Sequence, residues 1–132
     1  MAVPARLPLP PVLGRPALRS DENRLAAVLA DAFFDDPLFE WFHPSATSRR
    51  APLRRFFKAE LRANRSHGRV QTTTDVGAAA VWSPPGHWKT GIVESVLMFP
   101  ASVGLIRNPR GAIALFYEME RRHPIVPHWY LA

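Results

Sequence analysis

Apolar side chains recur at helical spacing in several stretches of the chain. Leu25, Leu29 and Phe33 form one such stripe, and Leu53, Phe57 and Leu61 form another. Because three to four residues make one helical turn, each stripe indicates a helix with one face turned to a core. The pattern predicts a helix from Ser20 to the Asp35-Asp36-Pro37 segment, a short helix at Leu38–Phe42, and helices at about Thr47–Ser66, Thr90–Ile106 and Arg110–Arg122.

Between these helices lie short runs rich in β-forming residues. They predict strands at Val12–Arg19, Val70–Thr74 and Ala78–Trp82, and a last strand from about Val126. The second and third form a hairpin around a turn at Asp75-Val76-Gly77. The order of elements predicts an α+β fold, or an α/β-like one, with a mixed sheet flanked by helices.

The expected helix ends rest on capping residues. Ser20 is predicted to be an N-cap, with Asp21 and Glu22 in the first helical turn. Proline disfavours the helical conformation in the residue before it, so Pro37 is expected to end the first helix. Gly68 is the expected C-cap of the third helix.

Length and composition indicate one globular domain. The chain has 132 residues, 47% of them hydrophobic and 21% charged. Residues 1–11 form a proline-rich tail that we expect to be extended, and residues 12–132 form the domain. The absence of cysteine excludes disulfides and thiolate metal sites and suits a cytoplasmic protein.

One stretch, residues 91–106, is apolar enough to be considered as a membrane-spanning segment. It is shorter than the roughly 20 residues that cross a bilayer, and it contains Glu94 and Pro100. We interpret it as a buried helix or helical hairpin and predict no membrane partner; a hairpin lying on a membrane surface is the alternative.

The net charge of +6 is concentrated in one segment. Eight basic residues lie between Arg49 and Arg69, against Glu60 alone. They indicate a solvated helix face, because the opposite face holds the apolar stripe. Binding to nucleic acid is not favoured, since no base-reading motif accompanies the arginines; a basic polyanion-binding protein is kept as an alternative.

Three phrases of the sequence resemble the GNAT superfamily of acyl-CoA-dependent N-acetyltransferases. ADAFFDDPLFEWFHP resembles the family's A-F-x-x-D-P-x-x-x-W, and AAAVWSPPGHW resembles its G-x-A-x-W-x-P-P-G. MERRHPIVPHWYLA resembles the start of the family's fourth strand, E-x-x-H-P-x-x-P-H-W-Y-L. The three phrases occur in the family's order and spacing from about Leu13 onward.

The resemblance implies acetyl-CoA as cofactor and an amine as acceptor, but it covers only part of the family's pattern. The glycine-rich loop Q/R-x-x-G-x-G/A, which holds the cofactor pyrophosphate at a helix N-terminus, is absent from this sequence. The sequence therefore resembles the N-terminal portion of such an enzyme, ending at the central strand. We expect it to be inactive alone.

The resemblance also implies an acceptor site, while catalytic residues stay unassigned. Asp36, with its neighbour Asp35, would hold an ammonium group, or would simply form a turn before Pro37. The other implied acceptor residues, each with a core-packing role as the alternative, are Phe34, Trp41, Trp129 and Tyr130.

The histidines show no metal-ligand spacing. His128, beside the last strand, is a candidate base, with a structural role as the favoured interpretation.

The last strand suggests a second kind of function. An unpaired apolar strand at a sheet edge is a template for pairing with another chain. The alternative to an enzyme is therefore a non-enzymatic module. Through residues 126–132 it would pair with a C-terminal half or with a second copy of itself.

Overall fold

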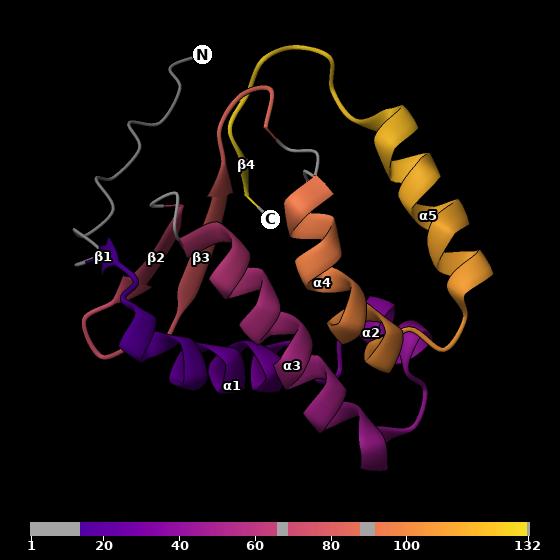
Figure 1. Ribbon diagram of the computed structural model, residues 1–132, viewed down its shortest axis with the longest axis horizontal. Coiled ribbons are helices and arrows are strands. Elements are labelled where there is room, and N and C mark those ends of the chain that lie inside the picture. Colours follow the sequence, from indigo (N-terminus) through magenta and orange to yellow (C-terminus); the bar gives the residue numbers. More distant parts are fainter. Residues whose placement is uncertain (1–13, 66–68, 88–91, 132) are drawn as a thin grey trace, which may run out of the picture.

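The computed structural model describes residues 14–65, 69–87 and 92–131 (Figure 1). It confirms the α+β fold. The elements are β1 (Gly14–Pro16), a 3-10 turn (Arg19–Asp21), α1 (Glu22–Ala32), α2 (Pro37–Phe42), α3 (Ala46–Arg65), β2 (Val70–Thr73), β3 (Ala79–Ser83), α4 (Ile92–Leu105), α5 (Pro109–Arg122) and β4 (Tyr130–Leu131).

The sheet has the strand order β1-β2-β3-β4. All three pairings are antiparallel, so the described strands do not form the mixed sheet that the sequence favoured. The predicted hairpin is confirmed, with Val70 opposite Val81. Among the described strands, β4 lies at the edge of the sheet and pairs with β3, through Ser83 opposite Tyr130 and Trp82 opposite Leu131.

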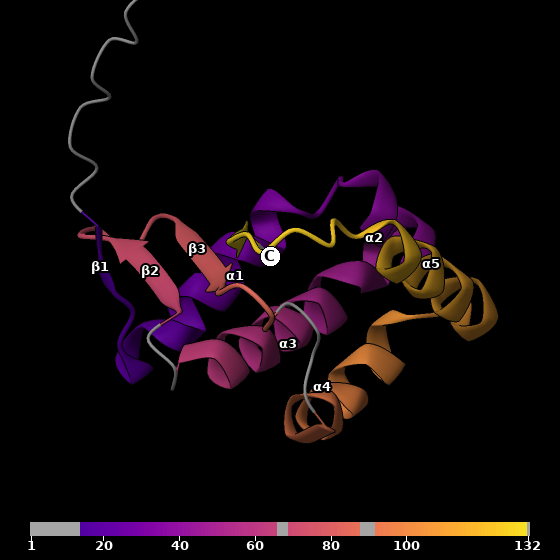
Figure 2. The same ribbon diagram turned by 90° about the horizontal axis from the view of Figure 1, so that it is seen from above.

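Two helices cover one face of this sheet. In Figure 2, α1 and α3 lie on the same side of β2 and β3. Their contact is a core cluster in which Leu25 of α1 and Leu61 of α3 meet Val70 and Val81 of the hairpin. Leu25, Leu61 and Val70 are each 1% exposed. The apolar stripes therefore face the sheet as the helical spacing predicts.

A second core forms at the other end of α3. It joins α2, α4 and α5 through phenylalanines and small residues: Ala30, Phe39, Phe42, Leu53, Phe57, Leu105 and Ala112. Some of the rings pack edge to face, as those of Phe39 and Phe42 do at 6.0 Å between centroids, and the rings of Phe39 and Phe57 are tilted. Ala112 is the only described residue of α5 that is fully buried, so most of α5 extends beyond this core.

Two predicted helix ends are wrong. Ser20 is not an N-cap; it lies inside the 3-10 turn, and Asp21 instead accepts the backbone N–H of Leu18 at 2.8 Å and pairs with Arg15. α1 ends at Ala32, before the Asp35-Asp36-Pro37 segment. The expected cap Gly68 lies outside the described residues.

The first and last strands are shorter than predicted. β1 begins at Gly14, where the described residues begin, and it ends at Pro16. The last strand begins at Tyr130 instead of near Val126. Proline has no N–H to give to a ladder, and Pro127 interrupts the predicted strand. None of the described helices is both long and apolar enough to cross a bilayer.

Candidate functional site

The structure divides the five predicted acceptor residues into two groups. Phe34, Asp36 and Trp41 lie at the junction of α1 and α2, whereas Trp129 and Tyr130 lie at β4. Figure 1 shows α2 near the lower ends of α4 and α5, and β4 beside the upper part of the sheet. The two groups therefore do not line one pocket.

Residues of the first group make contacts within the fold. The ring of Phe34 lies 5.1 Å from the guanidinium carbon of Arg49. Asp36 caps α2, because its Oδ1 accepts the N–H of Leu38 at 2.9 Å and that of Phe39 at 3.4 Å. Trp41 lies so close to Gly111 of α5 that a Cβ there would come within 2.8 Å of its ring.

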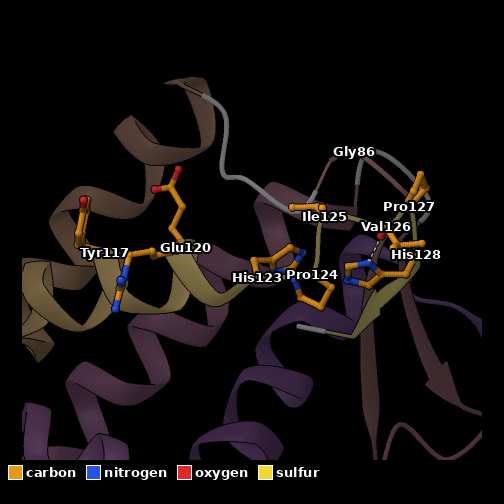
Figure 3. Close-up of a pocket in the computed structure, with 10 residues that line it drawn as sticks. Gly86, Tyr117, Glu120, His123, Pro124, Ile125, Val126, Pro127 and His128 are labelled. Atoms are coloured by element: carbon orange, nitrogen blue, oxygen red, sulfur yellow. Dashed lines mark hydrogen bonds between the residues drawn. The ribbon is translucent and has the colours of Figure 1, made fainter.

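A cavity of about 520 Å³ lies near the second group (Figure 3). It lies between the C-terminal end of α5, the turn after β3 and the segment that leads to β4. Its lining consists of Gly86, Tyr117, Glu120, Arg121, His123, Pro124, Ile125, Val126, Pro127 and His128.

The sequence explains why these segments form walls. Pro124 stops α5, and the N–H of His123 makes its last bond, to the carbonyl of Glu120 at 3.2 Å. On the other side, the N–H of His87 bonds the carbonyl of Pro84 at 3.0 Å, closing a β-turn. Gly86 has a φ of 79° in this turn, which a residue with a side chain rarely adopts.

Two imidazole rings stand together in the cavity wall. The ring centroids of His123 and His128 are 4.9 Å apart with an angle of 31° between the planes, and Figure 3 shows them side by side. The Nδ1 of His128 lies 2.7 Å from the carbonyl oxygen of Val126, so it donates that bond and leaves Nε2 as the acceptor. His123 also meets Tyr130 of β4, with an edge contact at 5.6 Å between centroids.

The surroundings of His123 favour its neutral form. Burial lowers the pKa of His123 from its usual value, and the neighbouring His128 lowers the pKa further. A neutral imidazole at neutral pH can accept a proton. Of the residues predicted as acceptor ligands, Tyr130 is the one that contacts this pair, whereas Trp129 is 63% exposed.

The cavity also holds charged groups from α5. Glu120 contributes a carboxylate. The guanidinium of Arg121 lies 3.0 Å from the carboxylate of Glu118, which offsets its positive charge. Within the described ranges, no group of three or more His, Asp or Glu side chains is placed to hold a metal ion.

From the sequence, the five-residue interval between His123 and His128 excludes a metal-ligand spacing, and His128 is a candidate base or a structural histidine. The sequence does not predict the contact between the two rings or the cavity. The signal that was present is the pair of prolines between them, Pro124 and Pro127. Each restricts the backbone, and together they turn the chain so that the two rings meet.

The described glycines Gly86, Gly104 and Gly111 do not form a pyrophosphate-binding loop. Gly111 is in the first turn of a helix, but its N–H donates to the side chain of Asn108 at 3.0 Å and the ring of Trp41 covers it. Gly104 lies near the end of α4, and Gly86 lies in the turn after β3. None of the three offers a run of free N–H groups at a helix N-terminus.

The basic segment around α3 is partly used inside the fold. Arg49 is 2% exposed. Arg50 pairs with Asp31, and Arg62 and Arg65 both pair with Glu22. Among the described residues, at least four of the eight basic side chains are thus buried or paired, which lowers the charge available to a polyanion.

Comparison with known proteins adds no assignment to this geometry. A scan against protein-family models finds no match for the chain, and a search of curated proteins finds no significant match either.

Proposed function

We propose that this chain binds the amine acceptor of a GNAT-like N-acetyltransferase. The amine enters the cavity beside His123 and His128, and a neutral imidazole takes its proton. The observation that carries the proposal is the contact between Tyr130 of β4 and His123 in the cavity wall. In the family that the sequence resembles, the fourth strand supplies the amide that polarises the acyl carbonyl, and β4 is the fourth strand here.

These residues would carry out one proton transfer. A primary amine is protonated at neutral pH and has no lone pair for attack until it loses a proton. The N–H bond of the ammonium breaks, its electron pair stays on nitrogen, and the proton moves to an imidazole nitrogen. The lowered pKa of His123 keeps that imidazole neutral beforehand. The carboxylate of Glu120 attracts the ammonium by charge.

In the proposed reaction this chain binds the amine and does not itself bind acyl-CoA. The sequence contains no Q/R-x-x-G-x-G/A loop, which supports this division.

An NMR titration tests the amine site. Adding n-butylamine is expected to shift the resonances of His123, His128 and Tyr130, whereas n-butanol, which has the same length and no charge, leaves them in place. His123→Gln should abolish the shifts. His87→Gln, which changes an exposed histidine at the rim of the β-turn, should keep them.

Two results would contradict the proposal. One is a set of amine-induced shifts that lies away from the cavity; the other is an unchanged response in a folded His123→Gln protein. Calorimetry with acetyl-CoA tests separately whether this chain binds the cofactor. A dissociation constant in the low micromolar range would show that it does.

One observation favours a second, non-enzymatic function. β4 lies at the sheet edge, and Trp129 and Leu131 are 63% and 55% exposed. An edge of this kind pairs readily with another strand. If pairing is the function, sedimentation velocity will show a concentration-dependent dimer that Leu131→Lys removes; a monomer at all concentrations would exclude self-pairing.

A further inference from the structure

Among its described side chains, α4 is covered on one side only. Met98 and Leu105 are buried at 9% and 0% exposed, whereas Phe99 and Val103 are 67% and 60% exposed. Phe99 and Val103 are four residues apart, so they lie on the same side of the helix. Figure 2 shows α4 beyond α3, on the far side from the strands. The outer side of α4 therefore presents large apolar side chains away from the sheet.

Three cations accompany this apolar surface. A Cβ at Gly104, the neighbour of Val103, would lie 3.7 Å from a terminal nitrogen of Arg55 in α3. Lys58 follows Arg55 by three residues, so it lies on the same side of α3. Arg107 is exposed and comes four residues after Val103. Within the part of the chain that the structure describes, none of these three cations forms an ion pair.

We propose that this outer side of α4 binds the surface of a bilayer that contains anionic phospholipid. The residues of this α4 surface are Phe99, Val103, Arg55, Lys58 and Arg107. The two apolar side chains enter the boundary between headgroups and acyl chains, and the cations contact the lipid phosphates. The sequence leaves a membrane-surface hairpin as the alternative to burial; α4 is one continuous helix, so a helix lies on the bilayer. The inference is independent of the amine site, which α5 and β4 form.

Charge and apolarity together favour a bilayer over two other occupants. A second copy bound through the same surface would bring like cations together, and residues 95–117 contain no Asp or Glu that could offset them. A soluble polyanion such as a nucleic acid would pair with the cations but leave Phe99 and Val103 in water, so it would gain nothing from them. An anionic bilayer offers phosphates and an apolar layer at one surface.

Co-sedimentation of the full chain with vesicles tests the proposal. The vesicles are made of phosphatidylcholine with and without phosphatidylserine. We expect binding that requires phosphatidylserine and weakens as salt is added, because salt screens exposed charges. Phe99→Ser should weaken this binding by roughly tenfold, as loss of a buried large apolar side chain does. Ile113→Ser is the matched control, because Ile113 of α5 is 70% exposed and lies outside the α4 surface, and it should leave binding unchanged.

A second pair of variants tests the cations. Each Lys or Arg close to an anionic bilayer contributes roughly fivefold in affinity, so Arg55→Gln and Arg107→Gln should each weaken binding by about that factor. Arg19→Gln removes the same charge from an exposed residue of the 3-10 turn. It should change binding by less than about twofold, because the attraction falls off within a Debye length.

A fluorescent label shows which helix enters the bilayer. The chain has no cysteine, so a single introduced cysteine can be labelled alone. With an environment-sensitive fluorophore on Val103→Cys, phosphatidylserine vesicles should shift the emission to the blue. The same label on Ile113→Cys should show no shift. All substituted positions are exposed, and circular dichroism checks that each variant keeps its fold.

Several results would overturn the inference. These are the absence of vesicle binding, equal binding with and without phosphatidylserine, and equal losses in Phe99→Ser and Ile113→Ser. A blue shift at Ile113→Cys but not at Val103→Cys would place the contact on α5 and would also contradict it. If heparin binds as tightly as the vesicles and Phe99→Ser changes neither, the surface binds soluble polyanions and the bilayer proposal is wrong.

Discussion

Arg49 holds Phe34 by two separate contacts. Its Nη1 donates to the carbonyl oxygen of Phe34 at 2.7 Å, and its guanidinium carbon lies 5.1 Å from the centre of the Phe34 ring. The same guanidinium donates to the carbonyls of His43 at 2.7 Å and Pro44 at 3.0 Å. One buried cation therefore ties together the loops before and after α2.

Replacement of Arg49 is expected to destabilise the fold strongly. Arg49→Met keeps the length of the side chain but leaves three carbonyl oxygens without their donor. Hydrogen bonds to a charged group contribute about 1.5–3 kcal/mol each before relaxation and water compensate. We expect a loss of about 2–4 kcal/mol in the free energy of unfolding, measured by urea denaturation.

The adjacent arginine is the control for this change. Arg50 pairs with Asp31 at the surface, where both side chains are more than half exposed. Arg50→Met should cost no more than about 1 kcal/mol, as exposed ion pairs do. Equal losses in the free energy of unfolding for Arg49→Met and Arg50→Met would show that the hydrogen bonds from Arg49 to the carbonyl oxygens add no stability.

Gly111 is expected to resist substitution although it lies in a helix. A Cβ at Gly111 would come within 2.6 Å of the Asn108 side chain that caps α5 and within 2.8 Å of Trp41. Gly111→Ala should therefore lower the melting temperature, because the cap or the tryptophan has to move. At Gly104 the nearest atom is a terminal nitrogen of Arg55 at 3.7 Å, so Gly104→Ala should stabilise by up to about 1 kcal/mol.

We expect opposite effects on stability at these two glycines. A gain in stability from both alanines would contradict this and would mean that helix propensity outweighs the contact between Trp41 and α5. Thermal unfolding followed by circular dichroism measures both variants under the same conditions.

Asp36 is expected to act in the folding of α2. Removing a capping carboxylate costs about 1 kcal/mol, so Asp36→Ala should lower the free energy of unfolding by about that amount. Asp35→Ala removes an exposed neighbour and should change it by less than about 0.5 kcal/mol. The acceptor role that the resemblance implies for Asp36 requires a different result: amine binding that falls in Asp36→Ala at unchanged stability.

His123 is expected to titrate below its usual range. Burial and the nearby His128 lower the pKa of His123 in the folded protein, so the proton binds more tightly when this region is open. The neutral ring therefore stabilises the closed segment above the unfolded pKa of about 6.5, and this contribution is lost as the pH falls below that value. An NMR titration of the His123 ring should give a midpoint below about 6.5.

The same titration can identify the cause of the shift. His128→Gln removes one of the two causes, so it should raise the pKa of His123 without restoring it fully. The protection factor of the Tyr130 amide, which corrects for the intrinsic exchange rate at each pH, should fall in acid in the native protein. A His123 midpoint at or above the usual value would contradict this account.

Some features of this protein follow from local chemistry, and the sequence alone determined them. The helices formed by the stripes of Leu25 and Leu53, and the hairpin around Asp75, appear where helical spacing and turn residues predict them. Side-chain periodicity depends only on backbone geometry, so it can be recognised before any tertiary contact is known. The burial of Leu53 and Leu61 follows from the same periodicity.

Other features exist only because distant segments meet. The sequence identifies Arg49 as one of a run of basic residues, and only packing shows that it alone is buried among the carbonyls of Phe34, His43 and Pro44. The ends of α1 and β4 depend on competing caps and on Pro127, and here local propensity gave the wrong boundaries. The pairing of His123 with His128, and the cavity beside them, depend on how α5, the β3 turn and β4 pack. Tertiary contacts decide these features because burial and distance, unlike periodicity, are properties of the whole fold.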